Sequence, residues 1–295
     1  MKKASVLIVL LILASISVLL LNKSDKQDQK PFIAVTSFTL YEISSKLLGD
    51  KIEVKKLIPF GSEMHTFRPS VKTMTTISKA KLFIFNGLGM EPWINKKYKN
   101  EMNIGKLINI IDYDDGHHHN KQGKDPHYWL DADNMFLMTH AISQRLIKEF
   151  PKYKNEIIYN EALLAQEYGS LDAQFSQALK KCKKREIIVN HNAFSYLGHK
   201  FDFHIHSVTG LSTDEQPSAK KMNEIAKLVK KDKIKYIFFE SFVSPKISET
   251  IAKETGVKTL PLHTLANVTQ QEAKKGYVSL MKENIKNIAI AMECE

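Results

Sequence analysis

The chain has 295 residues, of which 43% are hydrophobic and 25% are charged, and its formal net charge at pH 7 is +11. This composition fits a folded protein with room for two domains and excludes a largely disordered chain. The surplus lysines are spread along the sequence and form no compact basic stripe with interleaved aromatic residues, so nucleic acid is not an expected partner.

The N-terminus has the pattern of an export signal. Lys2 and Lys3 precede a run without charge from Ala4 to Leu21. The run is long for a cleaved signal and approaches the length of a membrane-spanning helix, so cleavage and retention as an inner-membrane anchor both stay open. No cysteine follows the run, and lipid attachment there is not expected. Residues 1–30 are therefore interpreted as a signal peptide or anchor plus a tether, and the rest of the chain is expected in the periplasm.

Strands and helices alternate through the next part of the chain. Apolar and alternating stretches predict strands, and stretches with helical spacing predict helices. Strands are predicted at 31–38, 51–60 and 81–87, and helices at 40–50 and 70–80. Such alternation is typical of a parallel sheet with helices on both faces. Residues 31–150 are therefore predicted to form an N-terminal α/β lobe.

A long helix is predicted to follow this lobe. Between Asn155 and Lys183 the chain has no proline and a single glycine, Gly169. Apolar residues at helical spacing mark one face; they are Leu164, Tyr168, Leu171, Phe175, Leu179 and Cys182. Such a helix spans roughly 40 Å, which is more than one small lobe requires. We interpret residues 151–184 as a rigid linking helix, and an ordinary long core helix is the alternative.

The alternation returns after this helix. Strands are predicted at 185–190, 203–208, 233–240 and 257–262, each followed by a helix, the last of which runs to about Met292. Residues 185–295 are therefore predicted to form a C-terminal lobe. The predicted fold class is α/β, with two lobes that are each a parallel sheet covered by helices, joined by one long helix, and with the ligand site between the lobes.

The only two cysteines are Cys182 and Cys294, which lie 112 residues apart. Outside the cytoplasm they could form one disulfide bond. The sequence does not show whether they meet, and we expect no bridge.

Four of the eleven histidines share one topological position. His65 and His127 lie in loops, and His191 and His263 directly follow predicted strands. Ligand sites in open α/β sheets form at the carboxyl ends of strands, so these four side chains can meet between the lobes. Neutral imidazole suits zinc, and four nitrogen ligands complete a tetrahedron. The sequence therefore predicts one metal site made of these four histidines.

Several motifs resemble those of a known family. The stretches IPFGSEMHTFRPS, DPHYWLD and NHNAFSYL resemble, in this order, three metal-ligand segments of the binding proteins that serve bacterial ABC importers for zinc and manganese. The stretches LSTDEQPSAKKM and FFESFVSPKISETIAKETGVKTLPL match later parts of the same pattern. The resemblance covers about residues 31–290, and the zinc-specific ZnuA type is the best match.

This resemblance implies both fold and function. Members hold one metal ion between two α/β lobes that a rigid helix joins. The chain is accordingly expected to bind zinc as cargo, to deliver it to the membrane subunits of an ABC permease, to act as a monomer and to catalyse no reaction. Manganese or another divalent metal is the alternative cargo.

The chain departs from the family at His263, where Asp is common. An all-nitrogen ligand set favours zinc over manganese, which prefers oxygen. If His263 lies outside the site, a water molecule would complete the tetrahedron.

Three acidic residues are further candidates near the site. Glu240 ends a predicted strand and could orient a ligand imidazole through its second nitrogen. Glu63 is an alternative oxygen ligand, and Asp125 is interpreted as a cap for the turn before Pro126.

The rival function from another class is a zinc-dependent hydrolase, which would need an open coordination position and a general base. The sequence contains no HExxH or comparable motif.

A histidine-rich stretch precedes His127. His117, His118 and His119 stand among acidic residues and glycine, in a segment without core-forming side chains. Three adjacent imidazoles on a loop can bind zinc weakly. We interpret this stretch as a low-affinity zinc collector, and a merely soluble loop is the alternative.

Overall fold

A computed structural model of the chain describes residues 30–112, 123–211, 217–240 and 246–295. Within it, Phe32–Glu295 forms one compact unit. The uncharged N-terminal run and the stretch His117–His119 lie outside the described residues. No helix in the described part is long and apolar enough to cross a membrane.

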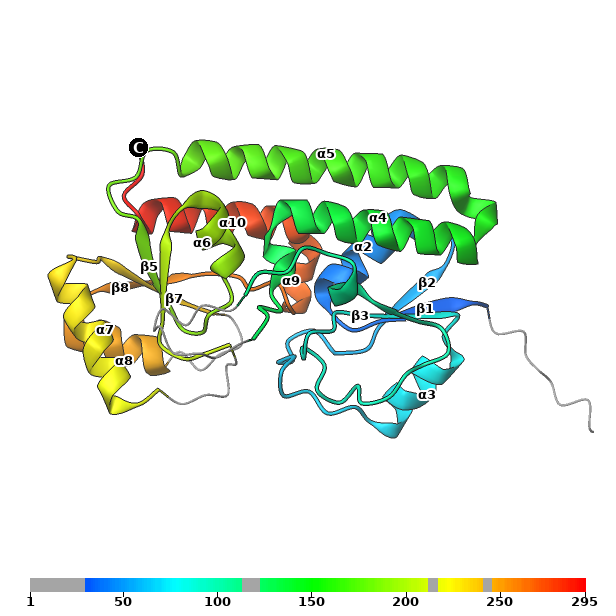
Figure 1. The fold of residues 1–295 in the computed structure, drawn as a ribbon, viewed down its shortest axis with the longest axis horizontal. Helices are drawn as coiled ribbons and strands as arrows, with labels where there is room; N and C mark the ends of the chain where they lie inside the picture. The colour runs from blue at the N-terminus through cyan, green and yellow to red at the C-terminus, as the bar shows by residue number, and fades with distance from the viewer. Residues whose placement is uncertain (1–29, 113–122, 212–216, 241–245) are drawn as a thin grey trace, which may run out of the picture. The chain divides into compact units, whose positions relative to one another are not determined.

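The N-terminal lobe contains a four-stranded parallel sheet (Figure 1). Its strands are β1 (Phe32–Val35), β2 (Glu53–Lys56), β3 (Leu82–Phe85) and β4 (Glu101–Asn103), in the spatial order β2-β1-β3-β4. All neighbouring pairs are parallel. Strands β1 and β3 are buried at every residue, which explains why their sequences are continuously apolar rather than alternating.

Helices cover both faces of this sheet. Helix α2 (Phe38–Leu48) packs on the face that carries Ile33. Helix α3 (Val71–Lys79) packs on the opposite face, which carries Ala34. Each of the two helices begins at a serine whose side chain accepts a backbone N–H of the first turn.

The linking helix α5 (Lys154–Ala178) extends over both lobes (Figure 1). It packs against α4 (Ala132–Glu149) and α10 (Tyr277–Ala291). Its buried face includes the predicted Leu164, Tyr168, Leu171 and Phe175. The helix ends at Ala178, before the predicted end of the linking helix at residue 184. Beyond it, the backbone N–H of Lys183 donates to the carbonyl of Glu293 near the C-terminus.

The C-terminal lobe is also built from parallel strands. They are β5 (Glu186–Val189), β6 (His204–Ser207), β7 (Tyr236–Phe239) and β8 (Lys258–Pro261). Strand β5 pairs with β6 and β7 pairs with β8, while β5 lies beside β7. The helices that follow the first three strands are α6 (Ser195–Phe201), α7 (Ala219–Lys231) and α8 (Lys246–Thr255). The predicted fold class is confirmed.

The predicted lobe boundaries at 31–150, 151–184 and 185–295 stay a prediction. One cluster of buried apolar side chains continues from the N-terminal lobe through α5 and α10 into the C-terminal lobe. A smaller cluster between the C-terminal strands and α7 and α8 belongs to that lobe alone.

The predicted final helix is two helices in the structure. Helix α9 (Gln270–Lys275) is separated from α10 by Gly276, which has a φ of 80°. Glu42 occupies the break, because its carboxylate accepts the backbone N–H of Tyr277 at 2.8 Å. A Cβ added at Gly276 would lie 3.3 Å from this carboxylate. Glycine therefore suits both the positive φ and the close approach of Glu42.

Cys182 and Cys294 form a disulfide bond, which corrects the expectation of no bridge. The two residues pair in antiparallel fashion, since the end of the linking region and the C-terminus of the chain lie side by side. The bond closes a loop of 112 residues that contains all four C-terminal strands.

Residues 264–268, here called the crossover segment, lead from β8 back to the N-terminal lobe. Three parts of that lobe donate hydrogen bonds to its carbonyl oxygens: Phe38 N to Ala266 O at 3.2 Å, Gly61 N to Val268 O at 2.9 Å and Trp129 Nε1 to Thr264 O at 2.7 Å. The segment therefore belongs to the C-terminal half of the chain but is held by the N-terminal lobe.

Candidate metal centre

Three histidines from distant parts of the chain meet in one place. His65 lies in the loop after β2, His127 directly precedes the short 3-10 helix η2 (Tyr128–Leu130), and His191 follows β5. One donor atom from each lies within 4.8 Å of the other two. A tetrahedral zinc ion with Zn–N distances of about 2.0–2.1 Å sets its nitrogens roughly 3.3 Å apart. The three imidazoles therefore need only a small contraction to bind a single ion.

His127 is prepared for such an ion by its neighbour Asp125. The carboxylate Oδ1 of Asp125 lies 2.8 Å from Nδ1 of His127 and accepts the backbone N–H of the same histidine at 2.9 Å. The other ring nitrogen, Nε2, is buried and has no hydrogen-bond partner among the residues that the structure describes. A buried nitrogen without a partner is costly unless something binds it. Asp125, interpreted from sequence as a turn cap, therefore also orients the imidazole.

His191 has an equivalent carboxylate in Glu240. Nδ1 of His191 lies 2.6 Å from Oε2 of Glu240, which follows β7. Burial by itself lowers the pKa of His191, but the charge and hydrogen bond of Glu240 outweigh burial and raise this pKa above its ordinary value. The predicted role of Glu240 as an orienting residue matches this contact.

His65 lies in a different electrostatic environment. Burial, and then the neighbouring His127 and His191, lower the pKa of His65 to about 3. Its ring is therefore neutral at neutral pH and has a lone pair available for a cation. Its backbone N–H donates to Oε1 of Glu63 at 3.2 Å, which keeps the carboxylate of Glu63 next to the site.

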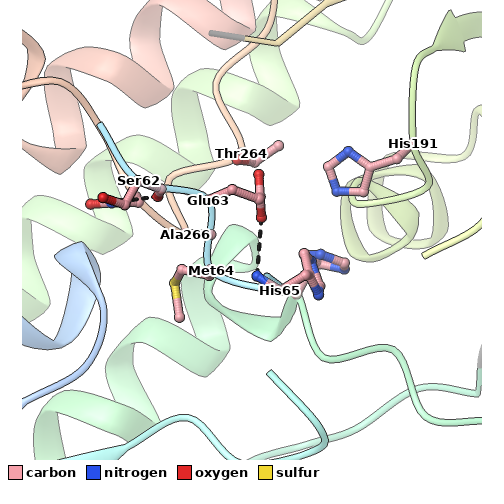
Figure 2. A pocket seen from close by; sticks show the side chains of 9 residues that line it. Ser62, Glu63, Met64, His65, His191, Thr264 and Ala266 are labelled. Carbon is pink, nitrogen blue, oxygen red and sulfur yellow. Dashed lines mark hydrogen bonds between the residues drawn. The ribbon is translucent and has the colours of Figure 1, made fainter. Parts of the chain in front are cut away.

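These side chains line a small pocket. Figure 2 shows the ring of His191 turned toward the pocket, with the carboxylate of Glu63 between Thr264 and the backbone nitrogen of His65. The lining residues are Ser62, Glu63, Met64, His65, His127, His191, Thr264, Ala266 and Asn267. The enclosed volume is about 10 Å³, which is about enough for a single water-sized group. A pocket of this size suits a single ion.

The fourth predicted histidine, His263, lies outside the group of three. Its Nδ1 is 3.3 Å from Glu272 on α9, and its Nε2 is 3.1 Å from Glu283 on α10. The side-chain amide of Asn284 holds its backbone at both the N–H and the carbonyl. The two carboxylates thus draw the imidazole toward the helices, although the next residue, Thr264, lines the pocket.

The remaining histidines of the described part lie elsewhere. His140 pairs with Glu161 at 2.7 Å, and His206 pairs with Glu186 at 3.0 Å. His199 and His204 are exposed, and these four histidines belong to no cluster with metal-ligand spacing.

The contribution of the crossover segment to the pocket was not predicted from the sequence. Thr264, Ala266 and Asn267 line it, yet they follow a predicted strand and resemble no motif. For Asp125, a usable signal existed, because its spacing of two residues from His127 brings an Asx carboxylate back to a nearby backbone N–H.

Comparison with known proteins points to one family. The family model described as "Zinc-uptake complex component A periplasmic" (ZnuA) matches residues 33–291. The zinc-binding lipoprotein AdcA of Streptococcus pneumoniae (strain R6) is 32% identical over 309 residues, which cover 97% of this chain and 60% of that protein. This chain thus spans about 60% of the length of that relative.

A shorter relative and a solved structure extend the similarity. The high-affinity zinc uptake system protein ZnuA of Bacillus subtilis (strain 168) is 29% identical over 281 residues, covering 90% of this chain and 88% of that protein. The Zn(II)-bound ZnuA-like domain of Streptococcus pneumoniae AdcA has a TM-score of 0.75 at 29% identity, covering 90% of this chain and 99% of that one.

Proposed function

This chain belongs to the ZnuA family of zinc-uptake components, and on that premise we propose that it captures zinc outside the cytoplasm and delivers it to an ABC permease. The observation that carries the proposal is the cluster of three converging histidines, one donor atom of each lying within 4.8 Å of the others. Two of these imidazoles have a carboxylate on Nδ1, which leaves Nε2 to face the ion.

The proposed protein ligands are His65, His127 and His191. Each is neutral when it binds, and imidazole nitrogen is a preferred donor for zinc. The fourth position goes to an oxygen donor, either a water molecule or the carboxylate of Glu63, which lines the same pocket. His263, whose ring nitrogens face Glu272 and Glu283, is not included in this set.

This donor set supports zinc as the cargo. Manganese prefers oxygen ligands, and three nitrogens with one oxygen suit it poorly. The pocket is too small for a substrate beside the ion. The proposed function therefore involves binding and release of zinc without any chemical reaction, and it assigns no catalytic residue.

The cellular setting completes the proposal. The N-terminal segment with Lys2, Lys3 and the uncharged run directs export, and the disulfide between Cys182 and Cys294 is of a kind that persists outside the cytoplasm. The protein acts as a monomer whose partners are zinc and the membrane subunits of the permease. The relatives named for zinc binding and zinc uptake support this assignment.

Competition between metals tests the proposal. Protein lacking residues 113–122 would be titrated with zinc against a chelator of known affinity, first alone and then with an excess of manganese. We expect one tight zinc site per chain and poor competition by manganese. His140→Ala serves as a control, because His140 pairs with Glu161 away from the pocket. Equal competition by manganese, or binding in the absence of His65, His127 and His191, would overturn the proposal.

A further inference from the structure

The crossover segment contacts the stretches of chain that carry His65 and His127. Trp129, two residues after His127, donates its indole N–H to the carbonyl of Thr264 at 2.7 Å, and its ring centroid lies 5.6 Å from that of His127. Gly61, four residues before His65, donates its backbone N–H to Val268 at 2.9 Å. One short segment therefore contacts both stretches of chain that carry these histidines.

Asn267 ties this segment to the loop that bears His65. Its Nδ2 donates to the carbonyl oxygens of Pro59 at 2.6 Å and Ser62 at 2.7 Å. Its Oδ1 accepts from Nζ of Lys56 at 2.7 Å. The residue is only 4% exposed, and it lines the metal pocket. Two hydrogen bonds therefore connect this buried amide to the His65 loop, and a third connects it to Lys56 at the end of β2.

The partners of Asn267 determine the orientation of its amide. A carbonyl oxygen can only accept a hydrogen bond, so Nδ2 must face Pro59 and Ser62, and Oδ1 then faces Lys56. Lys56 has no ion pair among the described residues; its Nζ also contacts the carbonyl of Ile58 and lies 4.2 Å from the ring centroid of Phe60. The contacts of Lys56 are therefore with Asn267 and the nearby residues Ile58 and Phe60.

We propose that Asn267 is a positioning residue of the zinc site, which holds the His65 loop against the crossover segment and so keeps the imidazole of His65 beside that of His127. The inference rests on the proposed function. Met64 anchors the loop by burial and the N–H of Gly61 bonds to Val268, while the carbonyl oxygens of Pro59 and Ser62 are both held by Asn267. With the two amide bonds in place, His65 is already positioned before zinc arrives, and binding does not need to restrict the loop.

Substitution of Asn267 by Asp tests this role. Asp has nearly the same shape and retains an acceptor for Lys56, but it places an oxygen against the carbonyls of Pro59 and Ser62. We expect zinc affinity to fall about 10–100-fold, the range found for residues that support metal ligands from outside. Cobalt(II), used as a spectroscopic substitute for zinc, should lose the intense visible absorption of a tetrahedral site. Lys56→Met should have a smaller effect, since both carbonyl bonds remain.

Asn134→Asp is a matched control. Asn134 is 1% exposed, and its amide accepts from the N–H and donates to the carbonyl of Asn109, both at 2.9 Å. Its substitution removes an equivalent buried hydrogen bond away from the pocket. The control variant should lose thermal stability but keep the zinc affinity and cobalt spectrum of the wild type. Equal losses of affinity in both variants would show a general structural effect and overturn the proposal.

Hydrogen exchange separates this inference from the proposed function. In the metal-free protein, the amides of residues 61–65 should exchange at least about tenfold faster in Asn267→Asp than in the wild type, because the loop opens locally. If these amides exchange equally fast in both proteins, Asn267 has no positioning role, whichever metal ion the protein binds. Absence of zinc binding by the wild type, with faster exchange in the variant, would instead overturn the proposed function.

Discussion

Nδ1 of His191 lies 2.6 Å from Oε2 of Glu240, so a carboxylate at the end of β7 determines which nitrogen of a histidine at the end of β5 faces the pocket. His127 and Asp125 repeat the arrangement at 2.8 Å. Because each carboxylate accepts a hydrogen bond from Nδ1–H, the free lone pair of the neutral imidazole lies on Nε2. Two of the three histidines are thus oriented by the fold before a cation binds.

The first prediction concerns pH. Glu240 raises the pKa of His191, so the metal-free site holds a proton at mildly acidic pH that zinc must displace. Zinc affinity should therefore fall as pH drops through this raised value. In Glu240→Gln the negative charge that raises the pKa of His191 is lost, while His191 stays buried. The fall in zinc affinity should therefore shift to lower pH.

Zinc affinity measured from pH 5 to 8 checks this prediction. Glu161→Gln is the matched control, because Glu161 pairs with the exposed His140. It should leave the pH profile unchanged. A profile for Glu240→Gln that overlays the wild type would contradict the role assigned to Glu240.

The second prediction compares two histidines. His127→Ala should weaken zinc binding by at least about 100-fold, beyond the usual effect of a residue outside the coordination sphere. His263→Ala should leave zinc affinity close to that of the wild type and lower stability by about 1 kcal/mol, because it removes the contacts with Glu272 and Glu283. Calorimetric titration and thermal unfolding measure the two effects. A loss of zinc binding in His263→Ala equal to that in His127→Ala would mean that His263 turns toward the ion.

The third prediction concerns the disulfide. The bond between Cys182 and Cys294 closes a 112-residue loop, and the chain-entropy relation assigns such a loop about 4–5 kcal/mol of stabilisation. The double variant Cys182→Ser, Cys294→Ser should lose about this free energy of unfolding in urea. Its zinc affinity should stay unchanged, because neither cysteine lines the pocket. A variant as stable as the oxidised wild type would contradict the prediction.

The fourth prediction concerns Lys200 on α6. Its Nζ lies 3.0 Å from Asp131, 2.9 Å from Asp133 and 2.7 Å from Asp172, which belong to the beginning of α4 and to α5. Burial lowers the pKa of Lys200, but these carboxylates outweigh it and raise this pKa. Lys200→Met leaves three carboxylates close together and should lower stability by about 1–2 kcal/mol at pH 7.

Lys220→Met is the control, since Lys220 forms an exposed pair with Glu224 at 3.9 Å. It should change stability within the error of urea unfolding. Equal losses in the two variants would show that the Lys200 network has no special role.

The sequence alone determined the features that depend on local pattern. Continuous apolar runs identified strands such as β1 and β3, and helical spacing from Leu164 to Phe175 identified the buried face of α5. The placement of His65, His127 and His191 after strands or in loops predicted a shared site, and the structure brings these three together. Their assignment as zinc ligands stays a proposal.

Only the tertiary structure decided the features that depend on contacts between distant residues. His263 follows a strand as His191 does, yet Glu272 and Glu283 draw its ring away from the cluster. Cys182 meets Cys294 because the end of the linking region lies beside the C-terminus. Side-chain direction and pairing across 20 to 200 residues follow from how the elements pack, and periodicity in the sequence does not encode this packing. For the same reason, the three hydrogen bonds of Asn267 became visible only in the folded chain.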